Sequence, residues 1–549
     1  MGFSITHRPD AIARAVEARP DLLVIGGGIT GAGIALDAVS RGLSVVLLEK
    51  NDFAWGTSSR STKLIHGGLR YLKQLEFKLV SEVGRERAIV HRNARHLVVP
   101  ERMLLPITAK GSLGRTGTSI GLLVYDLLAG VEPAERRKML AADETARTEP
   151  LLKNKGLKAG ALYYEYRSDD ARLTIENIKR SVELGATCLN HAEVNELLTD
   201  PFGQVNGARF TDHLTGRQHD VQATVVVNAC GPWVDLIRKK DDSLHGKRLQ
   251  LTKGVHLVVP HERLPLRQAI YFDVPDGRMI FAIPRENITY VGTTDTVYTD
   301  RIDRPVTDAA DVSYVLKGVN KMFRGISLAP KDVQSTWAGL RPLIHEDGKS
   351  PSELSRKDEI FHSPTGLISI AGGKLTGYRK MAERVVDAVL TRLPDQRRSG
   401  LRPCHTQDIR LTGGDFDDRD ALSDYIVDTA RRGESMGLDS DAIRSLIHRY
   451  GRQTSDILDR AHELMPDHDH APEAALRAEL AFCVENEAVA TMSDVLIRRT
   501  GMLYFDRPRA LAVRDRVEDE LKRLTDRDDV GRAAFDQALN DVVAFRATE

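Results

Sequence analysis

A glycine-rich turn between two short apolar runs is the sequence feature that most constrains the fold. The turn, Gly26-Gly27-Gly28-Ile29-Thr30-Gly31, follows the apolar run 22–25 and has glycine at its first, third and sixth positions. Glycine is needed there because the backbone turns tightly, approaches a ligand closely and lets a helix touch a strand. A helical stretch follows, and then a second apolar run, 45–48, closed by Glu49. The pattern predicts a strand–helix–strand unit of a parallel sheet.

The same unit predicts a dinucleotide site. A helix that begins at the turn points free N–H groups and a partial positive charge at a pyrophosphate. Glu49, at the end of the second strand, is placed to accept hydrogen bonds from ribose hydroxyl groups. A single G-x-G-x-x-G match is weak evidence, and its place between a strand and a helix is what strengthens it. The turn alone leaves NAD and FAD both open, because both bind in this way.

Length and charge set the limits of the other expectations. A chain of 549 residues exceeds one hydrophobic core, so two or three domains are expected. Lys plus Arg and Asp plus Glu both total 78, and this balance gives no global field to collect nucleic acid. The four cysteines lie far apart without a C-x-x-C pair, which argues against a disulfide framework or a metal site. We therefore expect no metal and a reducing, cytoplasmic location.

The sequence gives no sign of secretion or of a membrane span. Residues 1–20 lack the apolar core of a signal peptide. No stretch approaches the ~20 apolar residues that a membrane helix requires. The longest candidate, 119–131, is interrupted by Asp126. It is read as a buried helix, with docking on a membrane surface as the open alternative.

The pattern along the chain changes twice. A helix over about 172–183 leads into a strand at 187–189, and a further strand is expected at 225–227. Between about 254 and 293, runs rich in β-branched residues predict antiparallel strands of a second domain, at 255–259, 279–283 and 290–291. After Pro403 only helical spacing is seen, at 442–450, 474–485 and 514–524. The tail therefore predicts a separate helical domain.

Two long motifs, far apart and in a fixed order, carry a family resemblance. The first runs from Ile25 to Asp37 and ends in Arg41-Gly42, and the second is Gly372-Gly373-Lys374-Leu375-Thr376-Gly377-Tyr378-Arg379-Lys380-Met381-Ala382-Glu383. Together they resemble the signatures of the FAD-dependent glycerol-3-phosphate dehydrogenases. The resemblance covers nearly the whole chain, including the helical tail. It implies an α/β FAD-binding Rossmann-like fold of the D-amino-acid-oxidase type, with an α+β substrate domain and a C-terminal all-helical domain.

The resemblance also implies domain boundaries. Residues 1–20 are expected as an N-terminal extension, and 405–549 as the helical domain. A discontinuous FAD-binding domain is expected from 21–75, 155–235 and 335–395, and the substrate domain from 76–154 and 236–334. The sequence leaves two roles open for the helical tail, packing against the core or self-association into a homo-oligomer.

Carried over residue by residue, the resemblance implies the cofactor contacts. The pyrophosphate and ribose contacts would be Gly26, Gly28, Gly31 and Glu49, and Val194 stands where related flavoproteins hold the adenine. The stretch under the isoalloxazine ring would include Thr57, Ser58 and Lys63, and its pyrimidine end would meet Gly373, Lys374 and Thr376. The chain departs from the family pattern in Ala229-Cys230-Gly231, where threonine is expected in place of Cys230. One alternative is that Cys230 places a thiol near the cofactor, and the favoured interpretation is a small buried side chain without chemistry.

The substrate site is implied in the same way. Arg70 and Tyr71 would face the substrate, Arg341 would hold its anion and polarise the hydroxyl, and Lys374 would assist with phosphate or flavin. His66 is the candidate general base, because an imidazole titrates near neutral pH. His256 is the rival base or a substrate contact. Against this, a charged run is usually a solvated helix face and a lone histidine is usually structural.

The implied reaction is oxidation of sn-glycerol 3-phosphate to dihydroxyacetone phosphate, with hydride passing from C2 to FAD. A membrane quinone as electron acceptor, and peripheral attachment to the inner face of the cytoplasmic membrane, rest on the resemblance alone. Three alternatives stay open: a glycerol-3-phosphate oxidase that uses oxygen, an amine or amino-acid oxidase of the same fold, and a non-catalytic flavoprotein. The last would be expected to lack the set of Arg70, Arg341 and His66.

Overall fold

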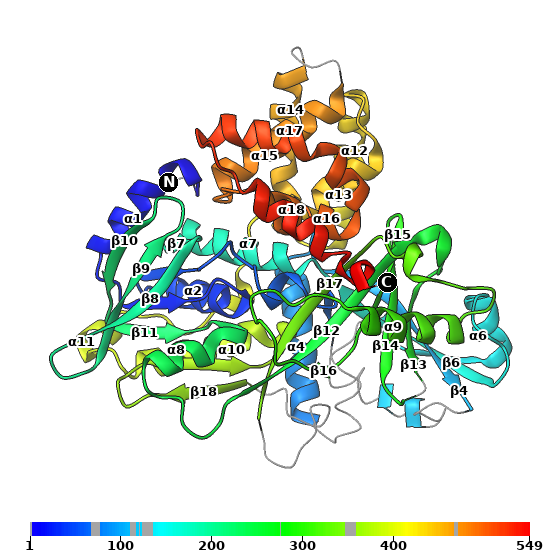
Figure 1. Ribbon diagram of the computed structural model, residues 1–549, viewed down its shortest axis with the longest axis horizontal. Coiled ribbons are helices and arrows are strands. Elements are labelled where there is room, and N and C mark those ends of the chain that lie inside the picture. The colour runs from blue at the N-terminus through cyan, green and yellow to red at the C-terminus, as the bar shows by residue number, and fades with distance from the viewer. Residues whose placement is uncertain are drawn as a thin grey trace.

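Two β-sheets stand side by side under a cap of helices (Figure 1). The computed structural model describes residues 3–66, 77–109, 117–119, 121–122, 135–274, 276–345, 358–465 and 470–548. The N-terminal half of the chain contributes strands to both sheets, and the C-terminal helices, yellow to red in Figure 1, lie above both. The candidate site residues therefore come from segments far apart in the sequence.

The first sheet is built around the glycine turn. Its strand order is β18-β19-β11-β1-β2-β7, parallel except for the edge pair β18 and β19. Alternate residues of β1 face opposite ways, so Leu22 and Val24 enter one core and Leu23 and Ile25 another. Both faces are thus covered, as a parallel sheet requires. The strands are β1 Leu22–Ile25, β2 Val45–Leu48, β7 Thr187–Leu189, β11 Val225–Asn228, β18 Asp358–His362 and β19 Ile368–Gly372.

Helices cover one face of this sheet, and a small sheet covers the other. The helices are α2 Ile29–Arg41, α7 Asp170–Glu183 and α10 Tyr378–Leu390, with α2 packed between the other two. On the second face lie the antiparallel strands β8 Ala192–Thr199, β9 Val205–Asp212 and β10 Arg217–Gln222, with α1 Arg8–Glu17 and α8 Val234–Lys240. Residues 1–20, expected as an extension, thus contribute Ile12 and Ala15 of α1 to this core.

The second sheet is mixed and mostly antiparallel. Its order is β16-β12-β15-β14-β13-β4-β6-β3, with β17 paired to β12 and β5 to β6, and α9 Ala309–Met322 packs on one face. Two further helices are α4 Phe77–Asn93 and α6 Ala142–Thr148, and α6 packs against β6. The strands are β3 Leu64–Ile65, β4 Val99–Thr108, β5 Lys138–Ala141, β6 Leu157–Arg167, β12 Leu249–Pro260, β13 Ala269–Asp273, β14 Met279–Arg285, β15 Ile288–Gly292, β16 Thr296–Val297 and β17 Ser335–Ile344.

A third unit, all helical, packs on the second sheet. One continuous core joins its helices to side chains of that sheet, including Val258, Tyr290 and Trp337. The helices are α12 Arg419–Ser435, α13 Ser440–Tyr450, α14 Thr454–Leu464, α15 Ala471–Asn486, α16 Met502–Phe505, α17 Arg507–Thr525 and α18 Arg532–Asp541. A short helix, α11 Asp395–Arg398, precedes them. We call the unit from α12 onward the helical cap.

The periodicity of apolar residues predicted the helices and strands better than it predicted which strands pair with one another. The expected helices in the tail, the helix that became α7 and the antiparallel strands β12, β14 and β15 are confirmed. Three strands differ from the expected boundaries, because β3, β6 and β17 fall in ranges assigned to the cofactor domain but hydrogen-bond into the second sheet. An apolar run shows that a strand is buried and does not show which sheet it joins.

Within the described residues, no helix has both the length and the apolar character needed to cross a bilayer. The run 119–131, considered as a membrane-docking segment, lies mostly outside the described residues.

Candidate active site

The glycine turn adopts a backbone that only glycine tolerates. Gly26 has φ of 110° and donates its N–H to the Leu48 carbonyl at 2.8 Å. A Cβ on Gly31 would lie 1.9 Å from the Gly26 oxygen, so the first turn of α2 packs directly on the strand end. Gly28 is the N-cap of α2 and has no side chain that could cap that helix. The turn therefore presents the positive end of α2 to the space beside it.

That space is a cavity of about 1460 Å³, part of it open to solvent. We call it the cofactor cavity. Eight predicted cofactor residues lie in its wall: Gly26, Gly28, Glu49, Thr57, Ser58, Val194, Gly373 and Lys374. Ser58 links two of these segments, since its hydroxyl accepts the Ile29 N–H at 2.9 Å. A Cβ on Gly28 would meet that hydroxyl at 3.2 Å.

Glu49 is held in place by main-chain donors. Its carboxylate accepts the N–H groups of Gly27 at 2.6 Å and of Asn51 at 2.9 Å. Burial raises the pKa of Glu49, and these two hydrogen bonds act in the opposite direction. A carboxylate fixed in this way at the end of β2 has lone pairs left to accept hydroxyl groups from a ribose.

Two tryptophans, which were not predicted as contacts, and Cys230 complete the wall. Trp55 and Trp233 lie against each other, with ring centroids 5.6 Å apart, and both line the cofactor cavity. Cys230 also lines it, and its thiol lies 3.4 Å from the Ile25 carbonyl. Burial raises the pKa of Cys230, so the thiol stays neutral. The scarcity of tryptophan, three in the chain, was the only available signal.

A second cavity of about 2280 Å³ adjoins the first. We call it the substrate cavity. Both walls share a set of residues from three segments: Thr57, Ser61, Pro342, Gly373, Lys374 and Leu375. His66, His256, Arg341, Lys374 and Thr376 all line it. The two cavities therefore share a wall that includes Lys374 and Thr57.

Arg341 has its guanidinium group fixed from one side. It donates to the Thr294 carbonyl at 3.0 Å, to the Thr293 hydroxyl at 3.0 Å and to the Asp295 carboxylate at 3.2 Å. A Cβ on Gly254 would lie 2.3 Å from its Nη2 atom, so the group rests on bare backbone of β12. The contact of residues 293–295 with Arg341 was not predicted from the sequence. The fork geometry of a guanidinium group held in this way suits an anionic oxygen.

His256 is buried behind the cavity wall, with 1% of its surface exposed. Its Nε2 atom lies 3.1 Å from the Thr62 hydroxyl, and its ring stacks on Trp337 at 4.8 Å. Burial lowers the pKa of His256 well below the usual value, with further lowering from Arg341 and Lys63. The imidazole is therefore neutral at neutral pH.

His66 occupies a more open position than His256. It is half-buried, its ring meets Phe281 edge-on at 6.1 Å, and its carbonyl accepts the Thr376 hydroxyl at 3.3 Å. The last contact joins the end of β3 to the second long motif. Arg70 and Tyr71, the other predicted substrate residues of this segment, lie outside the described residues.

Two predicted cofactor residues lie away from both cavity walls. Gly31 packs against Gly26 and serves the turn itself. Lys63 points at Asp170, with 2.5 Å between Nζ and the carboxylate, and 2% of the residue is exposed. A further Nζ contact of 3.0 Å reaches the Ser59 carbonyl. In this structure Lys63 thus fixes the course of the chain beneath the cavity, because burial of its charge demands a paired carboxylate.

The geometry fits a bound dinucleotide. The N-cap of α2 is a glycine without a capping side chain, and Cβ atoms on glycines of the turn would collide with neighbouring atoms. The Glu49 carboxylate is anchored by main-chain donors, and a second cavity adjoins the first. These features together suit a dinucleotide. The fold and the site together define the class of FAD-dependent oxidoreductases, whose family model matches residues 21–379 under the description "FAD dependent oxidoreductase". A second model, "C-terminal domain of alpha-glycerophosphate oxidase", matches residues 404–530.

Similar proteins identify the family within this class of oxidoreductases. The chain is 49% identical over 548 residues to the aerobic glycerol-3-phosphate dehydrogenase of Bacillus subtilis, covering 98% of each chain. It is 47% identical to that of Staphylococcus haemolyticus, covering 95% of this chain and 93% of the relative. Among solved structures, the glycerol-3-phosphate dehydrogenase of Bacillus halodurans complexed with FAD superposes with a TM-score of 0.84 at 44% identity, covering 98% of both chains. The chain belongs to the family of FAD-dependent, aerobic glycerol-3-phosphate dehydrogenases.

Proposed function

We propose that the chain oxidises sn-glycerol 3-phosphate to dihydroxyacetone phosphate. The observation that carries the proposal is that the cofactor cavity shares a wall with a second cavity, which is lined by a fixed arginine, Arg341, and two histidines. The relatives at 47–49% identity are named for this reaction, which supports the choice of substrate. When bound in the cofactor cavity, FAD supplies the acceptor for the hydride that leaves C2.

The residues of this chain have separate tasks in the proposal. Arg341, whose guanidinium group Thr293, Thr294 and Asp295 orient, holds a substrate oxygen and polarises the C2 hydroxyl. Lys374, in the wall common to both cavities, balances the phosphate or the cofactor charge. Arg70 and Tyr71 are proposed by resemblance as further substrate contacts, with Arg70 binding the phosphate.

His66 is proposed as the general base. It would take the proton of the C2 hydroxyl as the C2 hydride departs, leaving a ketone. The half-buried position of His66 in the substrate cavity supports this role. His256 is better suited to a neutral contact with the substrate than to proton uptake. Its pKa is strongly lowered, and its Nε2 atom is within hydrogen-bond distance of the Thr62 hydroxyl.

An anaerobic absorption spectrum of the purified protein, before and after addition of sn-glycerol 3-phosphate, tests the proposal. We expect a flavin spectrum that is bleached by this substrate, with one dihydroxyacetone phosphate formed for each flavin reduced. Glycerol without the phosphate is the matched control and should leave the spectrum unchanged. Bleaching by an amino acid, and none by glycerol 3-phosphate, would transfer the chain to the amine and amino-acid oxidases.

The proposed electron acceptor is a membrane quinone. The relatives are named aerobic glycerol-3-phosphate dehydrogenases, and this supports a dehydrogenase over an oxidase. Because a quinone is held in the bilayer, the proposal places the enzyme on the inner face of the cytoplasmic membrane as a peripheral protein. Stopped-flow reoxidation of the reduced enzyme by a short-chain quinone or by oxygen tests the acceptor. Faster reoxidation by oxygen, with stoichiometric peroxide, would identify an oxidase.

Washing membranes with salt and with carbonate tests the attachment.

A further inference from the structure

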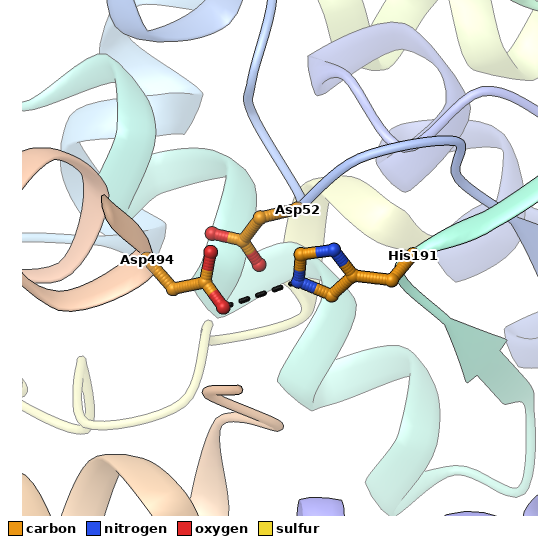
Figure 2. A group of neighbouring side chains, drawn as sticks. All are labelled: Asp52, His191 and Asp494. Atoms are coloured by element: carbon orange, nitrogen blue, oxygen red, sulfur yellow. Dashed lines mark hydrogen bonds and ion pairs between the residues drawn. The ribbon is translucent and has the colours of Figure 1, made fainter. Parts of the chain in front are cut away.

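Two aspartates and one histidine from distant parts of the chain lie close together beside the cofactor domain (Figure 2). Asp52 follows β2, His191 lies in the turn between β7 and β8, and Asp494 begins a π-helix, Asp494–Arg499, in the helical cap. Their potential ligand atoms lie within 4.8 Å of one another. Such spacing suits a cation, which could be a metal ion or a charged side chain.

Arginine side chains of the helical cap already provide that cation. Arg499 binds both oxygens of Asp52, at 2.7 and 3.0 Å, and Arg498 Nε reaches Asp52 at 2.5 Å. Burial by itself would raise the pKa of Asp52, but Arg499 and Arg498 hold it below its usual value. A metal ion would add charge beside two buried guanidinium groups, so the cluster is better described as a carboxylate clamped by arginines.

The clamp belongs to a larger buried network. Arg499 also contacts Glu487, at 3.3 Å, and Glu487 binds Arg172 of α7 at 2.6 Å. No side chain of the network is more than 4% exposed. Its charges balance, with four acidic and four basic members: Asp52, Glu176, Glu487, Asp494, Arg172, Lys179, Arg498 and Arg499.

On its other side, Asp52 adjoins the cofactor cavity. We call residues 49–63 the cofactor segment, because Glu49, Lys50 and Asn51 at its start and Thr57 and Ser58 further on line that cavity. The Asn51 N–H holds the Glu49 carboxylate at 2.9 Å, and the His191 N–H donates to the Asn51 carbonyl at 2.6 Å. A shift of Asp52 would therefore be passed to Glu49 through one intervening hydrogen-bonded residue.

The helical cap also reaches the far end of the cofactor segment. Phe505 of α16 lies against Lys63, with 5.6 Å between Nζ and the ring centroid, and against Trp337 at 5.7 Å. Trp337 in turn donates its indole N–H to the Ser61 carbonyl at 3.0 Å. The cofactor segment is thus held by the cap at both ends, by charge at Asp52 and by aromatic packing at Lys63.

We propose that Arg498 and Arg499 of the helical cap are positioning residues for FAD, which hold the cofactor segment, through Asp52, in the shape that binds the adenosine half of the cofactor. This gives the helical cap a role in the cofactor site that its sequence did not show. Because coupling between two sites is reciprocal, FAD binding must also tighten the contact of the cap.

The reciprocal effect can be measured on the unaltered protein. Hydrogen exchange of the apoprotein and of the FAD-bound protein is compared for peptides that cover 494–499. These residues do not line the cofactor cavity, yet we expect FAD to slow their exchange at least tenfold. As an internal control, peptides from α12, at the far side of the cap, should exchange equally in both states. Equal exchange of 494–499 with and without FAD would overturn the proposal.

Variants test the same coupling from the other direction. Asp52→Asn combined with Arg499→Met removes one buried charge of each sign and keeps the network balanced. We expect the dissociation constant for FAD, measured by flavin fluorescence, to rise at least tenfold, and Arg499→Lys alone to lie between this variant and the wild type. Arg460→Met, which breaks the exposed Arg460–Glu485 pair of the cap, is the matched control and should bind FAD normally.

An unchanged dissociation constant in the double variant would overturn the proposal. If that variant does not fold, Arg499→Lys and the exchange experiment decide the matter, since both use folded protein. FAD binding is measured without glycerol 3-phosphate, so a failure of the proposed reaction leaves this inference untouched, and its own failure leaves the reaction untouched.

Discussion

The Nη1 atom of Arg341 lies 3.2 Å from the Asp295 carboxylate, and both residues line the substrate cavity. The arginine lies on β17 and the aspartate just before β16, and both of these strands pair with β12. The ion pair therefore sets the direction of the guanidinium group before any substrate arrives. This relationship gives the first prediction.

Arg341→Lys should lower kcat/KM for sn-glycerol 3-phosphate by on the order of 100-fold, because an ammonium group loses the fork that binds an oxygen while held by Asp295. Flavin content should stay at one per chain. Steady-state kinetics and the absorption spectrum measure the two. The control is Arg263→Lys, which alters another arginine 3.2 Å from an aspartate in the same domain, Asp332, outside the cavity. Equal losses in both variants would contradict a role at the site.

His66→Asn should slow flavin reduction by about 100-fold or more while the bound flavin remains, since a positioned base contributes roughly that much. His256→Asn should chiefly raise KM, because it removes a neutral, buried contact with Thr62. Anaerobic stopped-flow reduction at several substrate concentrations separates the two effects. Should His256→Asn prove slow and His66→Asn fast, the base would be His256.

Gly31→Ala should impair FAD binding and destabilise the fold by about 1–3 kcal/mol, because its Cβ would lie 1.9 Å from the Gly26 oxygen and force the turn apart. Thermal unfolding of the apoprotein and flavin retention on gel filtration measure the two effects. Gly400→Ala is the matched control, since a Cβ there would meet nothing within 4 Å. Normal flavin retention by Gly31→Ala would show that the turn can open without loss of the site.

Acidification should destabilise the protein through His91. Burial lowers the pKa of His91 to about 4, whereas an unfolded histidine titrates near 6.5. The unfolded chain therefore binds a proton that the folded chain refuses, and the stability from neutral His91 is present above pH 6.5 and lost as the pH falls toward 4. The loss for this residue is about 2 kcal/mol between pH 7 and pH 5.

Chemical denaturation of wild type and His91→Asn at pH 7 and pH 5 checks this expectation. The variant keeps a donor for the Val98 carbonyl, which lies 2.6 Å from the His91 ring, and should show a smaller difference between the two pH values. The same substitution at the exposed His245 controls for loss of an imidazole elsewhere. An identical pH dependence in wild type and His91→Asn would remove His91 as a source of acid sensitivity.

The sequence alone determined the local elements of this protein. We could predict the glycine turn, the two strands that flank it and Glu49 directly. Glycine positions indicate the backbone conformation, and the periodicity of apolar residues indicates which side chains are buried, both over only a few residues. The second long motif, by resemblance, then narrowed the dinucleotide to FAD. Helices and strands were located, but β6 and β17 lie in ranges expected for the cofactor domain and pair in the second sheet, since a buried strand has the same pattern in either sheet.

Only the tertiary structure decided which charged groups meet. Asp52 and Arg498 are 446 residues apart and form a buried ion pair, and Lys63 pairs with Asp170, 107 residues along the chain. A charged residue is by default exposed, so nothing in its sequence neighbourhood shows that folding will bury it. The reason is physical: a buried charge is tolerated only beside its partner, and that partner is brought there by packing of the whole chain.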